Sequence, residues 1–387
     1  MLFTLEALEA RHGDALLLHY GDSGDPRLIV IDGGPAKVWA SSLRPRLEQL
    51  KARRSPSDPL ELRMVMVSHI DDDHINGILG LTDFLLELDD DGEEMPFEID
   101  TLWHNSFDDI LKKAKAKSAA FEGVATAAAS AEGAVPSLGL DEPTAALAAS
   151  VPQGRRLRDN SNKLDLNVNR PFKDLVSSPA KGKKTVKIGD GLTFTILGPN
   201  GERLDNLEED WKAKLKKKKN AKGAELQQLA AAFLDESVYN LSSIVVLAEA
   251  GGRTMLLTGD ARGDDILKAV RRTKVLKGER LHVDILKVPH HGSDRNVSTE
   301  FFRVITADHY VISANGEHGN PDVPTLKMLC EARADDDQPY TVYMTNKLTK
   351  VDNFLKGEQQ AGRKVRTVYR ADNARSLRVD LGDPLAD

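Results

Sequence analysis

Cysteine is nearly absent from this sequence, because Cys330 is the one cysteine among 387 residues. A single thiol excludes an intramolecular disulfide and a zinc cage of several thiolates, and it favours a reducing compartment. The chain also lacks a run of about 18 apolar residues, as a membrane-spanning helix would need, and its acidic first residues are not those of a signal peptide. We therefore expect a soluble, cytoplasmic protein with no membrane partner.

An excess of positive charge is missing as well. The chain carries 53 basic and 60 acidic residues, a formal net charge of −7. This balance argues against a protein that coats nucleic acid through its overall field. One basic run, "KAKLKKKKNAK" at 212–222, is typical of a solvated helix face. Beside a cleft, the same run would instead guide a phosphate backbone.

Short apolar segments with β-branched residues, bounded by Gly, Asp and Pro, fill the first hundred residues and return from residue 192 onward. Amphipathic stretches such as "INGILGLTDFLLEL" and "DDILKAVRR" separate several of them. Two strand-rich halves flanked by helices predict an α/β protein, a four-layer αββα sandwich, that forms a single domain over residues 1–387. No short internal repeat indicates a solenoid or propeller.

Two polar segments interrupt this pattern. Residues 111–183 are rich in Ala, Ser, Lys and Pro and have few large apolar side chains, which predicts an inserted helical or mobile segment outside the core. Residues 202–236 are predicted to be a second helical insertion. These helical insertions offer a surface for a protein partner.

The segment "SHIDDDH" places two histidines and three consecutive aspartates directly after the apolar strand "LRMVMVS". Carboxylates this close repel one another unless a cation lies between them. Imidazole and carboxylate groups suit Zn²⁺, Mn²⁺ or Fe²⁺, and alternation of side chains directs Asp72 away from the others. The alternative is a solvated acidic turn that caps the following helix. The candidate metal ligands in this segment are His69, Asp71, Asp73 and His74.

Three other apolar strands end in residues of the same kind. "LIVIDGG" ends with Asp32, "RTMLLTGDA" contains Asp260, and "VDILKVPHHGS" ends with His290, His291 and Ser293. Polar groups at the tips of four separate strands are what a metal site at one rim of a sheet requires. A buried structural histidine would explain one of these strand ends but not all four.

In this order, the motifs "IDGG", "SHIDDDH", "SSIVVLAEAGGRTMLLTGDA" and "DILKVPHHGS" resemble the metallo-β-lactamase-fold hydrolases, and most of all the soluble hydrolase domain of ComEC-type DNA-uptake proteins. The resemblance covers residues 1–110 and 185 to about 330. It implies two divalent metal ions, zinc or manganese, with Asp260 as the bridging ligand. It also implies that Asp32 supports the cluster by hydrogen bonding and that His290 or His291 is the late histidine ligand.

Three positions of this chain differ from patterns found among family members. The His69–His74 cluster has Asp71 where many family members have a second histidine, which is usual in the ComEC-like branch. Asn240 stands where many members have a middle histidine, so one metal lacks a protein ligand. The ComEC-like "GHP" reads Gly-Asn-Pro here, with Asn320 in the middle and His318 two positions earlier, which changes a contact on the substrate side.

His104 and Asn105 follow another strand, in "LWHNSFDD". They border the same cleft or, equally well, form a strand-end turn capped by polar side chains. The remaining histidines considered lack a comparable context and are expected to be structural or surface residues; they are His12, His19, His282 and His309.

The function expected from these residues and this resemblance is a metal-dependent phosphodiesterase or nuclease acting on nucleic acid or a small phosphodiester. Two metals about 3.5–4 Å apart lower the pKa of a bridging water to about 7, and Asp73 or Asp260 orients the resulting nucleophile. One alternative is hydrolysis of a small ester, phosphoester or lactone. Another is a binding module without catalysis on a degenerate hydrolase fold.

Overall fold

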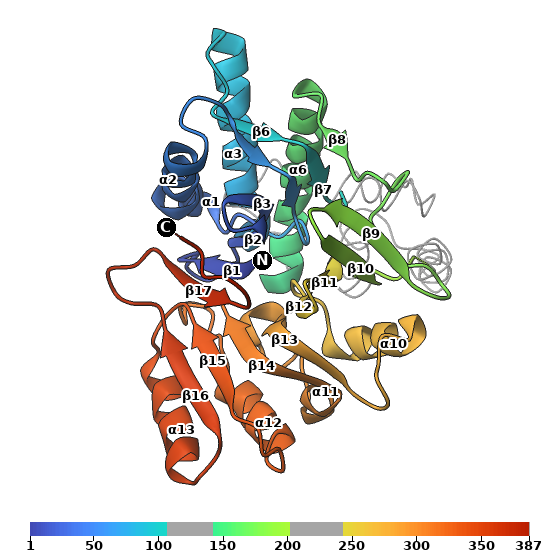
Figure 1. Ribbon diagram of the computed structural model, residues 1–387, viewed down its shortest axis with the longest axis vertical. Helices are drawn as coiled ribbons and strands as arrows, with labels where there is room; N and C mark the ends of the chain where they lie inside the picture. The colour runs from blue at the N-terminus through green and yellow to red at the C-terminus, as the bar shows by residue number, and fades with distance from the viewer. Residues whose placement is uncertain (107–141, 202–242, 387) are drawn as a thin grey trace, which may run out of the picture.

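The structure is a computed structural model that describes residues 1–106, 142–201 and 243–386, without the side chains of residues 142–151. Two large sheets form its centre (Figure 1). The first has seven strands in the order β17-β1-β2-β3-β5-β7-β8. Their bounds are β1 Leu2–Leu8, β2 Leu16–Asp22, β3 Asp25–Ile31, β5 Met64–Met66, β7 Thr101–Trp103, β8 Asn167–Val168 and β17 Ser376–Asp380.

The second sheet has eight strands in the order β16-β15-β14-β13-β12-β11-β10-β9. Its strands from β12 to β16 run parallel to one another, whereas β9 to β12 are joined antiparallel. The bounds are β9 Lys184–Gly189, β10 Leu192–Gly198, β11 Val245–Ala250, β12 Arg253–Leu257, β13 Leu281–Lys287, β14 Ile305–Ile312, β15 Tyr340–Met344 and β16 Val365–Tyr369.

Helices connect the strands of both sheets, and a small sheet pairs β4 (Leu60–Leu62) with β6 (Phe97–Ile99). The helices near the first sheet are α1 Ala36–Val38, the π-helix η1 Trp39–Leu43, α2 Arg44–Arg54, α3 Asp72–Asp91 and α6 Glu142–Lys163. Those near the second are α10 Gly263–Thr273, the 3₁₀ turn η4 Pro289–Gly292, α11 Thr299–Val304, α12 Val323–Ala332 and α13 Thr349–Gln360.

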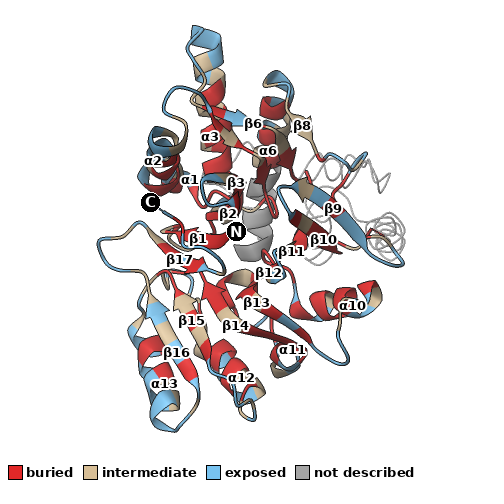
Figure 2. Ribbon diagram, viewed as in Figure 1, coloured by how far each residue is buried: buried red, intermediate tan, exposed pale blue. Residues whose placement is uncertain are grey.

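The core lies in three clusters, because both faces of each sheet are apolar. On β2, Leu18 packs in a cluster that contains Met255 of the other sheet, whereas its neighbour Leu17 packs in a cluster with Leu79 of α3. On the far side of the second sheet, Leu286 shares a cluster with Phe301 of α11. Figure 2 shows the buried residues concentrated in the strands and on the helices next to them.

The expected α/β class is confirmed, and each apolar run that predicted a strand after residue 184 lies in the second sheet or in β17. Helix α13 was not predicted, because its segment "TKVDNFLKGEQQ" is mostly polar. Its buried residues Val351 and Leu355 are four positions apart, which suffices for one apolar face. Among the described residues, no helix combines the length and apolar character that crossing a membrane requires.

The segment predicted to lie outside the core contributes to it in its described part. Helix α6 carries the fully buried Leu157, and β8 extends the first sheet beside β7. Asn160 of α6 donates hydrogen bonds to the side chains of Thr82 and Asp83 on α3. The expectation failed because low average hydrophobicity still permits one apolar helix face. Residues 107–141 and the insertion predicted at 202–236 lie outside the described residues, so the insertion boundaries stay predictions.

Strand direction places the candidate ligands at one edge. In the first sheet β3 is parallel to β5, with Ile31 opposite Met66, and in the second β12 is parallel to β13, with Leu256 opposite Leu286. The carboxyl ends of parallel neighbours lie side by side, which is where α/β proteins place polar sites.

Candidate metal centre

Four chain segments meet at the carboxyl ends of these strands. Asp32 follows β3, His69 follows β5, Asp260 follows β12, and His291 lies in η4 directly after β13. His74 joins them from the first turn of α3. The residues thus come from both sheets, and each of their side chains is almost completely buried.

Asp32 and Ser68 determine how His74 presents its ring. Asp32 Oδ1 accepts the backbone N–H of Ser68 at 2.6 Å, and Asp32 Oδ2 accepts the Ser68 hydroxyl at 2.7 Å. The same Oδ2 lies 2.9 Å from Nδ1 of His74. A carboxylate so engaged accepts a hydrogen bond from the ring, so Nδ1 carries the hydrogen and Nε2 of the neutral ring has a lone pair. Asp32 thus lies within hydrogen-bond distance of the candidate ligand His74, and its role in supporting a metal centre stays a prediction.

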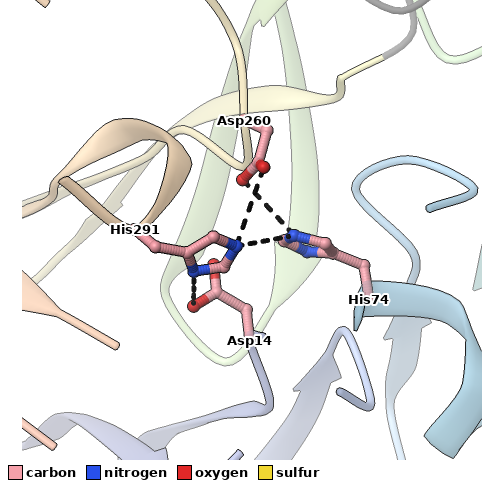
Figure 3. Close-up of side chains that lie close together, drawn as sticks. All are labelled: Asp14, His74, Asp260 and His291. Atoms are coloured by element: carbon pink, nitrogen blue, oxygen red, sulfur yellow. Dashed lines mark hydrogen bonds and ion pairs between the residues drawn. The ribbon is translucent and has the colours of Figure 1, made fainter. Parts of the chain in front are cut away.

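His291 is held in the same way by the backbone. Its Nδ1 lies 3.0 Å from the carbonyl oxygen of Ser313, which can only accept a hydrogen bond. The lone pair of the neutral ring is therefore on Nε2. This atom lies 3.2 Å from Nε2 of His74. Figure 3 shows the two nitrogens facing each other. Two lone pairs facing each other at this distance repel unless a proton or a metal ion lies between them.

Carboxylates surround these two nitrogens. Asp260 Oδ1 is 3.3 Å from Nε2 of His74, and Asp260 Oδ2 is 3.6 Å from Nε2 of His291 (Figure 3). Asp73 Oδ2 is 3.2 Å from Nε2 of His291. Asp260 Oδ1 is buried without a hydrogen bond within the described part of the chain. An acceptor in that state costs free energy unless a positive group satisfies it.

The pKa values reflect the same need for positive charge. Burial lowers the pKa of His74, but Asp260, Asp73 and Asp32 outweigh it and raise the pKa well above its ordinary value. For His291, burial is likewise outweighed, mainly by Asp260 and Asp14, and the pKa rises to about 10. Burial raises the pKa of Asp260, but the neighbouring histidines lower it well below the usual value. A divalent cation would supply this positive charge, so the buried residues fit a metal ion.

The remaining predicted ligands lie around this pair. His69 Nε2 is 3.4 Å from Asp71 Oδ2 and 3.8 Å from Asp260 Oδ2. His290 Nε2 is 3.6 Å from the same oxygen of Asp260, and its side chain is 28% exposed. The side chain of Asp72 points away from this group, as expected. Its carboxylate instead accepts hydrogen bonds from Asn76 and Gln153. The sequence left open which histidine of the pair points inward: His291 is buried inside the group, whereas His290 lies at its open side.

Asp14 belongs to this group and was not among the residues predicted from the sequence. Its Oδ1 is 3.5 Å from Nδ1 of His291, and its Oδ2 is 2.7 Å from Nζ of Lys287, which is also buried. Asp14, His74, Asp260 and His291 together could hold a metal ion. Asp14 stands two residues before β2, and β2 is antiparallel to β3 with Leu16 opposite Ile31, so Asp14 lies beside the end of β3. This pairing is a tertiary contact, which no motif around Asp14 indicated.

The backbone at the site adopts conformations that non-glycine residues rarely take. Asp32, His290 and His291 have positive φ angles of 57°, 47° and 54°. Such residues cost about 1–3 kcal/mol each and gather at functional sites, where the surroundings hold them. The two histidines of "PHHG" are thus presented by a strained turn rather than by a regular helix.

The other predicted site residues have different environments. Asn105 exchanges two hydrogen bonds of 2.9 Å with the backbone of Val176, which indicates a structural role, and His104 is buried beside it. Ser293 is buried and directly follows η4. The amide of Asn320 lies 3.5 Å from the carbonyl oxygen of His290. Asn240 lies outside the described residues, so the missing middle ligand stays a prediction.

A cleft of about 100 Å³ opens beside the centre. Its lining includes Asp73, His290 and His291 together with the loop that contains Glu317 and His318. A substrate in this cleft would therefore be in contact with the group of buried ligands. The geometry fits a metal-dependent hydrolase in general terms.

A comparison with models of known protein families found no match. Among curated proteins, the chain is similar to ComE operon protein 3 of Bacillus subtilis (strain 168), with 31% identity over 97 residues. The match covers 24% of this chain and 12% of the relative, so it concerns a fragment of each protein. It agrees with the ComEC-type resemblance of the motifs.

Proposed function

We propose that this protein is a metallo-β-lactamase-fold hydrolase that cleaves phosphodiester bonds with the help of two divalent metal ions, zinc or manganese. The observation that carries the proposal is the pair of facing Nε2 atoms of His74 and His291, with Asp260 beside both. Two apolar-faced sheets with helices against their outer faces support the fold assignment. The resemblance of the motifs to ComEC-type DNA-uptake proteins, with which the partial similarity to ComE operon protein 3 agrees, supports a nucleic acid as substrate.

Two subsets of residues would hold the metals. His69 lies near both Asp71 and Asp260 Oδ2, and His74 lies near Asp260 Oδ1. Asp260 would therefore contribute a carboxylate oxygen to each of the two subsets. Many carboxylates and few histidines make an oxygen-rich site, which suits Mn²⁺ as well as Zn²⁺. The full ligand set proposed is His69, Asp71, Asp73, His74, Asp260, His290 and His291.

The metals, when bound, would lower the pKa of a water molecule and stabilise negative charge on the phosphate. The protein contributes orientation. Asp73 is 24% exposed and faces the cleft, so its carboxylate can accept a hydrogen bond from the attacking water and direct a lone pair at phosphorus. Asp32 and the Ser313 carbonyl hold the two histidines, so that the ligand geometry needs little rearrangement during the reaction.

The test is cleavage of three substrates, single-stranded DNA, double-stranded DNA and bis-p-nitrophenyl phosphate, by metal-free protein to which Mn²⁺ or Zn²⁺ is added. We expect metal-dependent cleavage of bis-p-nitrophenyl phosphate and of at least one DNA. No metal-dependent cleavage of any of the three would refute the proposal. Cleavage of p-nitrophenyl acetate or a lactone in place of the phosphodiesters would identify the alternative substrate class.

Matched variants separate the centre from the rest of the protein. Asp260→Asn and Asp73→Ala should lower cleavage by about 100-fold or more, since each removes a proposed ligand. Asp264→Asn is the control, because Asp264 is half exposed on α10 and pairs with Arg262 and Lys268. All three should keep the circular dichroism spectrum of the wild type. Full turnover by Asp73→Ala would show that the ligand assignment is wrong.

A further inference from the structure

A second group of ligand-type side chains lines the cleft beside the centre. It consists of His12, Glu317 and His318, here called the rim triad, whose ligand atoms lie within 4.8 Å of one another. All three line the same cleft as Asp73 and His290. Of these three, the sequence pointed only to His318, for a contact on the substrate side, whereas His12 was expected to be a structural or surface residue. His12 and Glu317 are 305 positions apart.

The contacts within the rim triad leave metal-binding atoms available. His12 Nδ1 lies 3.0 Å from Glu317 Oε2, so the second nitrogen of His12 is not used by this contact. The rings of His12 and His318 meet edge to face, with centroids 4.7 Å apart. His318 forms no hydrogen bond or ion pair with any described residue. Arg11 lies 3.5 Å from the same Glu317 oxygen, which leaves Oε1 for another partner.

The loop that carries Glu317 and His318 is tied to its surroundings. Its residue Gly316 has a φ of 86°, and a side chain at that position would meet Leu348 at 3.1 Å. The backbone N–H of Glu317 donates to Asn315 Oδ1 at 3.0 Å. After the loop, the N–H of Asp322 donates to the carbonyl oxygen of Gly292, which directly follows His291. The rim triad is therefore held in a defined position relative to the centre.

Two histidines and one carboxylate are a common ligand set for divalent transition metals, with positions left open for other ligands. The triad is partly exposed and faces the cleft, so the open positions would be directed at a bound substrate. A phosphate bound in this cleft would lie beside residues of both groups. The alternative is that His12 and Glu317 form only an exposed ion pair. That alternative would not account for the position of His318 beside them or for the cleft that all three residues share with the centre.

We propose that His12, Glu317 and His318 form a rim site for a divalent cation, separate from the buried centre, and that this cation binds a phosphate next to the one being cleaved. The proposal that the rim triad binds a cation is independent of the proposed function. The proposal that this cation contacts the substrate rests on the proposed function. The substrate class then narrows to phosphodiesters with a neighbouring phosphate, as in a nucleic acid chain.

The metal-binding part is tested by titrating metal-free protein with Mn²⁺ and counting bound equivalents by calorimetry. We expect His318→Ala and Glu317→Gln each to bind about one equivalent fewer than the wild type. The control is His282→Ala, because His282 is an exposed histidine at the start of β13. Equal numbers of equivalents in the wild type and all variants would overturn the rim site.

The substrate part is tested by comparing kcat/KM for bis-p-nitrophenyl phosphate, which has one phosphate, with that for a short single-stranded oligonucleotide. We expect His318→Ala to lower kcat/KM about ten-fold further for the oligonucleotide. Equal losses on both substrates would overturn the contact with a neighbouring phosphate. If the wild type cleaves neither, the proposed function fails, and the count of bound Mn²⁺ alone decides the rim site.

Discussion

Consecutive aspartates at the start of α3 have opposite environments. Asp71 Oδ2 lies 3.4 Å from the buried His69, whereas Asp72 accepts hydrogen bonds from Asn76 and Gln153 at the surface. Asp73 points back to His291. The helix begins at Asp72, so these three side chains leave the chain in different directions. Charge alone therefore does not identify a ligand in this run.

This difference predicts different outcomes for two similar substitutions. Asp71→Ala should weaken Mn²⁺ or Zn²⁺ binding by about ten-fold or more, because it removes a carboxylate next to His69. Asp72→Ala should leave metal affinity within about two-fold, because its carboxylate contacts only polar neighbours outside the group. Metal titration of both variants is the measurement. The assignment of these side chains would be wrong if the two variants lost metal to the same extent.

At the scale of elements, two glycines bring α3 against the chain after β3. A Cβ on Gly77 would lie 1.9 Å from the carbonyl oxygen of Gly33, and a Cβ on Gly33 would lie 2.4 Å from the backbone nitrogen of Ile78. The close approach allows Gly33 N–H to donate to the His74 carbonyl at 2.7 Å. The "IDGG" motif thus positions both Asp32 and the helix that carries His74.

Gly77→Ala should therefore destabilise the protein and disturb the centre. The added methyl group has no space, and we expect a loss of about 2 kcal/mol in the free energy of unfolding. Because His74 lies one turn earlier in α3, metal affinity should fall as well. Urea denaturation and metal titration of the variant measure the two effects.

Gly357→Ala is the matched control for Gly77→Ala. Gly357 lies inside α13, and a Cβ there would meet nothing within 4 Å. Alanine should raise the free energy of unfolding by about 0.5–1 kcal/mol, because it favours helix more than glycine does. Unchanged stability in Gly77→Ala would show that α3 does not approach Gly33 so closely.

At the scale of the whole molecule, a buried network joins the two ends of the chain. Glu6 of β1 accepts hydrogen bonds from Arg46 of α2 and from Ser376 of β17, and its Oε2 lies 2.9 Å from Nε2 of His19 on β2. Arg54 donates to Nδ1 of His19 at 3.1 Å. Protonation of His19 would break that last bond. This network is separate from the metal centre.

The network predicts a loss of stability in acid. Burial, with Arg54 and Arg46 nearby, lowers the pKa of His19 from 6.5 to about 4 despite Glu6. Between these two pH values the unfolded chain binds a proton that the folded protein does not, so the stability from His19 is complete above pH 6.5 and disappears toward pH 4. A shift of this size corresponds to ~3 kcal/mol.

Urea denaturation of the wild type and of His19→Gln between pH 7 and pH 4 tests this. The free energy of unfolding of the wild type should fall more steeply over this range, because the variant lacks the titrating ring. The histidines of the metal centre contribute equally to both proteins and cancel in the comparison. If the free energies of unfolding of the two proteins fell in parallel with pH, the lowered pKa of His19 would be wrong.

Most strands were predictable, because the alternation of apolar residues and the Gly, Asp and Pro residues that bound each strand are local properties of the chain. "LFTLEAL" and "SLRVDL" are strands β1 and β17, but their pairing, with Leu5 opposite Val379, is a tertiary fact. Helix α6 was misjudged because composition averages over a segment, whereas packing depends on single residues such as Leu157. Likewise, the histidines of "PHHG" were found from the motif, but which one is buried follows from the strained turn.

By itself the sequence determined the α/β class, the strand ends at which ligand-type residues stand, and the distinction between Asp72 and its neighbours. These features depend on the periodicity of side chains, which is a local property of the sequence. Only the tertiary structure decided that His74 and His291 face each other, that Asp14 joins them, and that His12 meets Glu317. Such contacts depend on strand order and on how two sheets pack, and no local pattern records which distant segments become neighbours.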